Sequence, residues 1–162
     1  MKKHMQTIIN VCFAIFITMY IIQNNKLNEE VEAANIGLIK TLYSDYNTAF
    51  IKNDFPRIAS HFETPVNFAS NEIIAETEKD VVSRYEVMKA TIQEGYAYSV
   101  TGDVTIKRQS DNSYLLCADF TRFNKQKEVL FEGRAEYQWI NVPDKGWKMN
   151  YLKGIDRGSN PI

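Results

Sequence analysis

The chain has 162 residues, which suits one folded domain, and 44% hydrophobic and 12% aromatic residues are enough for a core. The formal net charge is −1 and no basic run follows the N-terminus, which argues against a nucleic-acid partner. Cys12, Cys117, His4 and His61 are the only cysteines and histidines. They are too few for a disulfide framework or an ordinary zinc site, so we expect no metal and no cofactor.

The N-terminal residues 1–26 have the pattern of a targeting segment. Two lysines and a histidine precede residues 7–22, which are almost wholly apolar. This pattern predicts a cleaved secretory signal or an uncleaved signal-anchor, although a spanning helix needs about 20 residues. The domain would then lie outside the cytoplasm, exported or held at a membrane through residues 7–22. The alternative is a buried N-terminal helix of a cytoplasmic protein.

Helical periodicity begins at about Asn28 and stops at Asn53. Apolar residues recur there at the spacing of one helix face: Val31, Leu38, Ile39, Leu42, Tyr43, Tyr46, Ala49 and Phe50. Asp54 is a predicted N-cap for a short second helix with Pro56 in its first turn, ending near His61 and Phe62.

Short strands and a third helix are predicted next. Glu63–Pro65 should break the second helix, residues 65–69 alternate like a strand, and residues 73–74 form a possible second one. Thr77 and Asp80 form a relaxed capping box for the third helix, which should end at Gly95. Its apolar stripe is Val81, Val82, Tyr85, Met88 and Ile92.

Four antiparallel strands are predicted over about 96–108, 114–124, 128–139 and 147–151. Alternation places one phase of each strand inward: Tyr96, Tyr98, Val100, Val104 and Ile106; Tyr114, Leu116, Ala118, Phe120 and Arg122; Val129, Phe131, Gly133, Ala135, Tyr137 and Trp139; Trp147, Met149 and Tyr151. Asp119 and Cys117 fall in the outward phase. These elements predict a domain over residues 27–155 and a loose tail over residues 156–162.

Helices and strands in separate blocks indicate an α+β fold, with three amphipathic helices to cover a curved, mostly antiparallel sheet. The element order resembles the nuclear transport factor 2-like superfamily and its SnoaL-like branches, over about Glu32 to Tyr151. The similar stretches are Tyr43–Phe50, Asn53–Phe55, Ile58–Phe62, Gly95–Ser99, Arg122–Asn124 and Gly146–Met149.

The resemblance implies a cystatin-like cone, closed by helices, with a pocket at its wide end. Members of the superfamily include ketosteroid isomerases, scytalone dehydratases, polyketide cyclases, small-molecule binders and dimerising modules. Such a fold does not select among functions.

On these phases, the pocket of such a cone would be lined by Tyr43, Tyr46, Phe62, Tyr85, Met88, Tyr98, Phe120, Arg122, Tyr137 and Trp139. Arg122 would be the only inward charge, and its guanidinium could bind a ligand carboxylate or phosphate through two hydrogen bonds. Alternatively, its head reaches water at the strand end or pairs with a helix carboxylate. The tyrosines and other aromatic residues could equally form core.

Two catalytic candidates remain, His61 as a general base and Tyr46 as a hydrogen-bond donor. The alternatives are a histidine at the rim and a tyrosine in the core. Because no carboxylate has a clear inward position, the isomerase pattern does not carry over, and the sequence favours a domain without catalysis. We expect it to bind a small apolar or anionic molecule, or to form a homodimer through the outer sheet face. The alternative is a cofactor-independent isomerase, dehydratase or polyketide-cyclase-like enzyme.

Overall fold

The structure is a computed structural model that describes the backbone of residues 2–155 and the side chains of residues 17–155. The chain divides into two compact units, one ending at Leu38 and the other beginning at Ile39. Each unit is described here by itself. The predicted tail over 156–162 lies outside the described residues.

The first unit consists of helical chain. Helix α1 covers Lys2–Lys52 and is continuous near Asn28, where two separate segments were expected, because no proline or glycine interrupts it there. Most of the described large apolar side chains of this unit are exposed, including Val31 and Leu38, at 52% and 49%. The prediction that these two lie on the buried face is therefore wrong: within the described side chains, the buried stripe of α1 begins at Ile39.

The predicted signal or anchor over residues 7–22 falls mostly on side chains outside the described part, so it stays a prediction. Within the described residues, no helix is long and apolar enough to cross a membrane.

The second unit begins with the end of α1 and two short elements. Asn53, with a φ of 57°, ends α1, and Asp54 caps helix α2 (Phe55–Ser60) by accepting a hydrogen bond from the Arg57 backbone N–H at 3.2 Å. Strand β1 (Phe62–Phe68) starts directly after α2. It includes Glu63 and Thr64, which were predicted only to break the helix.

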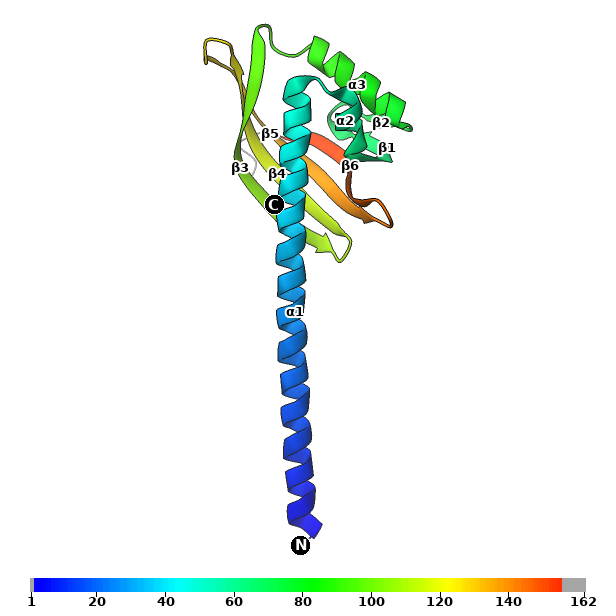
Figure 1. The fold of residues 1–162 in the computed structure, drawn as a ribbon, viewed down its shortest axis with the longest axis vertical. Helices are drawn as coiled ribbons and strands as arrows, with labels where there is room; N and C mark the ends of the chain where they lie inside the picture. The colour runs from blue at the N-terminus through cyan, green and yellow to red at the C-terminus, as the bar shows by residue number, and fades with distance from the viewer. Residues whose placement is uncertain (1, 156–162) are drawn as a thin grey trace. The chain divides into compact units, whose positions relative to one another are not determined.

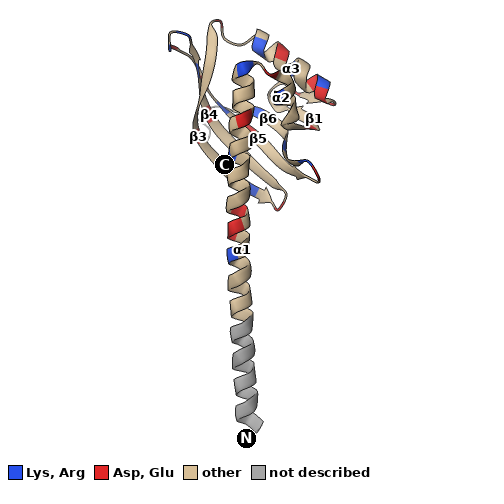
Figure 2. Ribbon diagram, viewed as in Figure 1, with Lys and Arg blue, Asp and Glu red and all other residues tan. Residues whose placement is uncertain are grey.

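A 3₁₀ turn, η1 (Ala69–Asn71), and strand β2 (Ile73–Ala75) lead to helix α3 (Glu78–Ala90). Thr77 and Asp80 form the predicted capping box. The helix ends at Ala90, before the predicted stop at Gly95, whose φ of 78° instead serves the turn into the next strand. Acidic and basic residues are mixed along α3, as Figure 2 shows.

The main sheet is formed by β3 (Tyr96–Ser110), β4 (Ser113–Asn124), β5 (Val129–Val142) and β6 (Gly146–Ile155). The six strands lie in the order β2-β1-β6-β5-β4-β3 (Figure 1), and every pair is antiparallel except β1 with β6. Strand β6 runs past the predicted end at Tyr151, because its pairing with β5 continues to Ile155. The α+β class and the curved sheet with helices are confirmed.

The core lies between one face of this sheet and the three helices. The predicted inward phase of β4 and β5 is buried at Tyr114, Leu116, Ala118, Ala135, Tyr137 and Trp139, each at most 5% exposed. Residues of the same phase are exposed at the start of β5, where Val129 and Phe131 are 56% and 41% exposed. Alternation thus predicted the buried face of the sheet correctly, but it did not predict that residues of this face are exposed near a strand end.

Two irregularities in strand pairing change the predicted phases. The register of β3 shifts between Tyr96 and Tyr98, and Tyr98 stacks on Phe123 with ring centroids 5.2 Å apart. The next residue, Ser99, faces the core, so the Tyr98 side chain points to the opposite face of the sheet. A second shift beside Trp139 pairs Tyr151 with Gln138 and Leu152 with Tyr137. The predicted inward position of Tyr151 is wrong, because the shift exchanges the two faces of β6.

Candidate functional site

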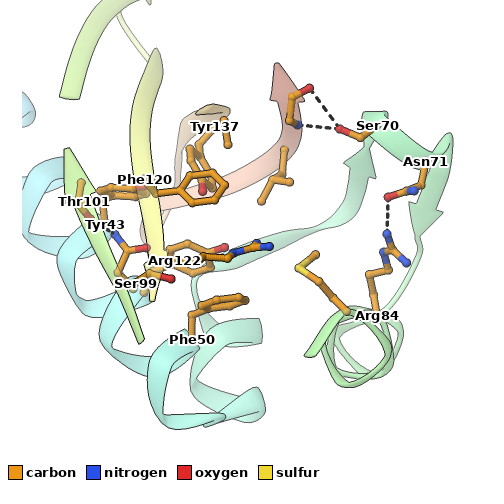
Figure 3. Close-up of a pocket in the computed structure, with 16 residues that line it drawn as sticks. Tyr43, Phe50, Ser70, Asn71, Arg84, Ser99, Thr101, Phe120, Arg122 and Tyr137 are labelled. Atoms are coloured by element: carbon orange, nitrogen blue, oxygen red, sulfur yellow. Dashed lines mark hydrogen bonds between the residues drawn. The ribbon is translucent and has the colours of Figure 1, made fainter. Parts of the chain in front are cut away.

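A cavity of about 250 Å³ lies between the sheet and the helices of the second unit (Figure 3). Its lining residues come from α1, η1, α3 and the strands β3 to β6: Tyr43, Tyr46, Asn47, Phe50, Ser70, Asn71, Arg84, Met88, Ser99, Thr101, Phe120, Arg122, Ala135, Tyr137, Leu152 and Gly154. None of these side chains is a carboxylate or an imidazole. The cavity combines aromatic rings with amides, hydroxyls and two guanidinium groups.

Small residues in register across three strands leave this space open. Ala118 pairs with Ala135, and Ala135 pairs with Gly154, so the sheet has a row without large side chains on its inner face. The neighbouring row carries larger residues, with Tyr137 opposite Leu152. At the end of the small row, the Gly154 backbone N–H donates to Ser70 Oγ at 2.7 Å, which joins β6 to η1 (Figure 3).

Tyrosine hydroxyls lie at the inner end of the cavity. Tyr46 Oη and Tyr85 Oη are 2.8 Å apart, and the Tyr43 and Tyr46 rings contact the Tyr137 ring at centroid distances of 5.1 and 5.7 Å. Burial raises the pKa of Tyr46, Tyr85 and Tyr137 well above the ordinary value. These hydroxyls are therefore neutral and serve as hydrogen-bond donors and acceptors, not as bases.

Arg122 extends from β4 into the cavity. Its Nη1 donates to Gln93 Oε1 at 2.9 Å, and its guanidinium carbon lies 5.0 Å from the Phe120 ring centroid and 5.3 Å from that of Phe131. Its Nε is buried and has no hydrogen-bond partner among the described residues. Burial lowers the pKa of this guanidinium from its usual value. The partner of Arg122 is thus a neutral amide, not the helix carboxylate that was one predicted alternative.

Arg84 supplies a second guanidinium, which the sequence did not indicate. It extends from α3, its Nη2 donates to Asn71 Oδ1, and its Nε is likewise buried without a partner (Figure 3). The signal that could have found it is spacing: Arg84 lies one helical turn before Met88, which was predicted to face the pocket. The predicted apolar stripe of this helix does not include Arg84.

Lys89 adds positive charge beside Arg122. Its Nζ lies 4.3 and 4.2 Å from the ring centroids of Phe50 and Tyr96 and donates to the Phe50 carbonyl at 3.1 Å. Burial and the nearby Arg122 charge lower the pKa of Lys89 to about 8. Lys89 does not line the cavity, but its ammonium group is close enough to Arg122 for the two positive charges to repel each other.

The structure divides the predicted pocket residues into three groups. Tyr43, Tyr46, Met88, Phe120, Arg122 and Tyr137 line the cavity. Tyr85 and Trp139 are wholly buried behind it, and Phe62 is 7% exposed. The placement of Tyr98 in the pocket is wrong, because the register shift in β3 turns it to the outer face. The missed lining residues are mostly polar, since the sequence search followed apolar phases.

His61 is buried at 6% exposure, so the alternative of a histidine at the rim is wrong. Its Nε2 lies 3.0 Å from Asp45 Oδ2, and Asp45 also accepts from Arg57 Nε and Nη2 at 3.0 and 2.6 Å. This His61–Asp45 pair is not part of the cavity lining. The described residues contain no group of three or more His, Cys, Asp or Glu side chains placed to hold a metal ion.

His61 should make stability depend on pH. Burial lowers its pKa below the ordinary 6.5, against the opposing effect of Asp45, and the Lys148 and Arg57 charges lower it further. As pH falls through 6.5, the unfolded chain takes up a proton that the folded chain resists, so stability decreases. Asp45 stays ionised in this range, because the hydrogen bond from Arg57 lowers its pKa.

We expect urea unfolding to show a loss of stability from pH 6.5 to pH 5 that His61→Gln reduces. The amide of glutamine keeps a hydrogen bond to Asp45 but does not titrate. Identical pH profiles for the two proteins would contradict this assignment.

Asp119 faces outward, as predicted. It is adjacent to Phe120, which lines the cavity, and it accepts a hydrogen bond from Arg134 Nη2 at 3.1 Å on the opposite face of the sheet. No strand carboxylate therefore reaches the cavity from β4.

A curved, mostly antiparallel sheet whose inner face is covered by helices around a cavity defines the NTF2-like class of α+β domains. The family model described as NTF2-like protein (DUF6841) matches residues 32–152, and the chain belongs to this family.

Several solved structures are similar in fold to this chain. A domain of unknown function with a cystatin-like fold from Nostoc punctiforme has a TM-score of 0.65 at 13% identity, covering 78% of this chain and 79% of its own. An NTF2-like superfamily protein from Salmonella enterica has a TM-score of 0.62 at 13% identity, covering 81% and 96%. A putative scytalone dehydratase from Novosphingobium aromaticivorans has a TM-score of 0.60 at 15% identity, covering 82% and 96%.

No curated protein matches the chain. At these low identities, the similarity to solved structures establishes the fold alone.

Proposed function

We propose that this domain binds a small amphipathic molecule in the cavity between the sheet and the helices. The observation that carries the proposal is the cavity of about 250 Å³, whose walls combine aromatic rings with convergent polar groups. Ligand sites in proteins typically have this composition, in which apolar walls supply affinity and a few polar groups fix orientation. The space equals that of about eight water molecules, which suits a ligand of one or two rings.

A second candidate is a cofactor-independent isomerase, dehydratase or polyketide-cyclase-like enzyme. The His61–Asp45 pair favours it, since such a pair can move protons. The pair lies outside the cavity lining, however, and the hydroxyls of Tyr46 and Tyr85 are neutral because burial raises their pKa. Binding without chemistry is therefore the function that the geometry supports best.

The test uses a substitution that fills the cavity. Ala135 lies in the row of small residues and is 5% exposed, so Ala135→Leu projects a larger side chain into the space. We expect titration calorimetry to show binding of 2-naphthoate, or of its neutral isostere 2-naphthamide, to the wild-type protein and at least a tenfold loss in Ala135→Leu. Thr105→Leu, at an exposed position of β3, is the matched control and should bind normally. Binding that survives Ala135→Leu, or no binding of either probe to the wild type, would overturn the proposal.

A further inference from the structure

Within the described part of the chain, the two arginines of the cavity have no charged partner. Arg84 donates a hydrogen bond to the side-chain amide of Asn71, and Arg122 donates one to the side-chain amide of Gln93. None of the residues that line the cavity is an aspartate or glutamate. Among the described residues, two guanidinium groups therefore face one cavity without a carboxylate to neutralise them.

Buried donors make this arrangement costly. The Nε atoms of both arginines are buried and have no hydrogen-bond acceptor within the described structure. A buried polar group without a partner is rare in proteins, and it costs more when the group is charged. The contact of Arg122 with the Phe120 and Phe131 rings explains where its side chain lies. That contact supplies no acceptor for Nε and no counter-charge.

We propose that the ligand is an organic carboxylate with a planar apolar body, whose carboxylate binds Arg84 and Arg122 and whose body lies against the aromatic wall. This inference depends on the proposed function and names the class of its ligand. Carboxylate oxygens match the fork of a guanidinium and can accept from its terminal nitrogens. The aromatic wall is formed by Phe50, Tyr43, Phe120 and Tyr137, which Figure 3 shows around the Arg122 side chain.

The surroundings are consistent with an anion site. Lys89 lies close enough to Arg122 for the two charges to interact, so a third cation is present near the cavity. The hydroxyls of Tyr43 and Tyr46 and the Asn47 amide, which donates to Thr101 Oγ1 at 3.2 Å, give the remaining walls neutral polar groups. Such groups bind water or ligand oxygens without repelling an anion.

The experiment compares 2-naphthoate with 2-naphthamide, which have nearly the same shape and differ in charge. By titration calorimetry, we expect the wild-type protein to bind the acid at least tenfold more tightly than the amide, as charge-assisted hydrogen bonds would give. Arg84→Gln and Arg122→Gln should each remove most of this preference while leaving amide binding within about threefold. Arg84→Lys and Arg122→Lys, which keep the charge without the fork, should retain part of it.

Lys153→Gln is the control for net charge, because Lys153 is exposed on β6 beside the cavity residue Gly154 and should leave the preference unchanged. Thermal melting of each variant shows that it is folded. Equal binding of the acid and the amide to the wild type would overturn the carboxylate inference and leave the proposed cavity function intact. A loss of preference in Lys153→Gln as large as in the arginine variants would also overturn it, because nonspecific charge would then explain the effect.

Discussion

Replacing Trp139 with alanine should cost about 3–5 kcal/mol of the free energy of unfolding, a large part of the roughly 5–15 kcal/mol typical of a domain. Trp139 is 0% exposed, and it pairs across the sheet with Tyr114 on β4 and Met149 on β6. Truncation there leaves a hole between elements that cannot close over it. Urea unfolding at neutral pH, followed by circular dichroism, measures the loss.

A second substitution at Trp139 tests whether this residue stabilises the core without contacting the ligand. The Trp139 Nε1 is buried and has no acceptor in the part of the chain that the structure describes. Trp139→Phe removes this donor together with ring area, so it should cost less stability than the alanine variant. Trp139→Phe should also keep the affinity for 2-naphthoate, because Trp139 does not line the cavity. Val129→Ala, on the same strand at 56% exposure, is the control and should change stability by no more than about 0.5 kcal/mol. A loss of naphthoate binding in a stable Trp139→Phe protein would show that Trp139 contributes to the binding site.

The hydrogen bond between Tyr46 and Tyr85 should contribute the second large effect. Tyr85→Phe or Tyr46→Phe alone leaves a buried hydroxyl without its 2.8 Å partner, which costs about 1–3 kcal/mol. The double variant removes both hydroxyls, so its cost should be smaller than the sum of the single costs. Urea unfolding of the four proteins gives the coupling energy.

Tyr98→Phe is the matched control for this cycle, since the Tyr98 ring lies against Phe123 on the outer face. It should leave stability nearly unchanged. Strict additivity of the Tyr46 and Tyr85 substitutions would show that the two hydroxyls do not act as a pair.

Most elements could be predicted from local patterns. The caps at Asp54 and Thr77 and the alternation of β4 and β5 are properties of neighbouring residues, and the structure confirms each of them. The ends of β6 and α3 were predicted less well, because pairing with β5 extends the strand and packing decides where a helix stops.

The site was only half predictable. Arg122 and the tyrosines Tyr43, Tyr46 and Tyr137 continue apolar phases, and the structure brings them to one cavity. Arg84 could not be found in this way, because a polar residue beside an apolar stripe is normally in solvent. Tyr98 was misplaced because the shift in strand pairing between Tyr96 and Tyr98 exchanges the faces of the residues after it, until a second shift between Thr101 and Val104.

The sequence by itself determined the class of fold, the buried face of the sheet and one inward arginine, since periodicity and capping act over a few residues. Only the tertiary structure decided that Ala118, Ala135 and Gly154 lie in one row and leave a cavity, because register joins residues far apart in the chain. It also placed Arg84 opposite an amide and not a carboxylate, and among the described residues it gave neither arginine a counter-ion. Those facts depend on packing between α3, η1 and the sheet, which no local pattern records.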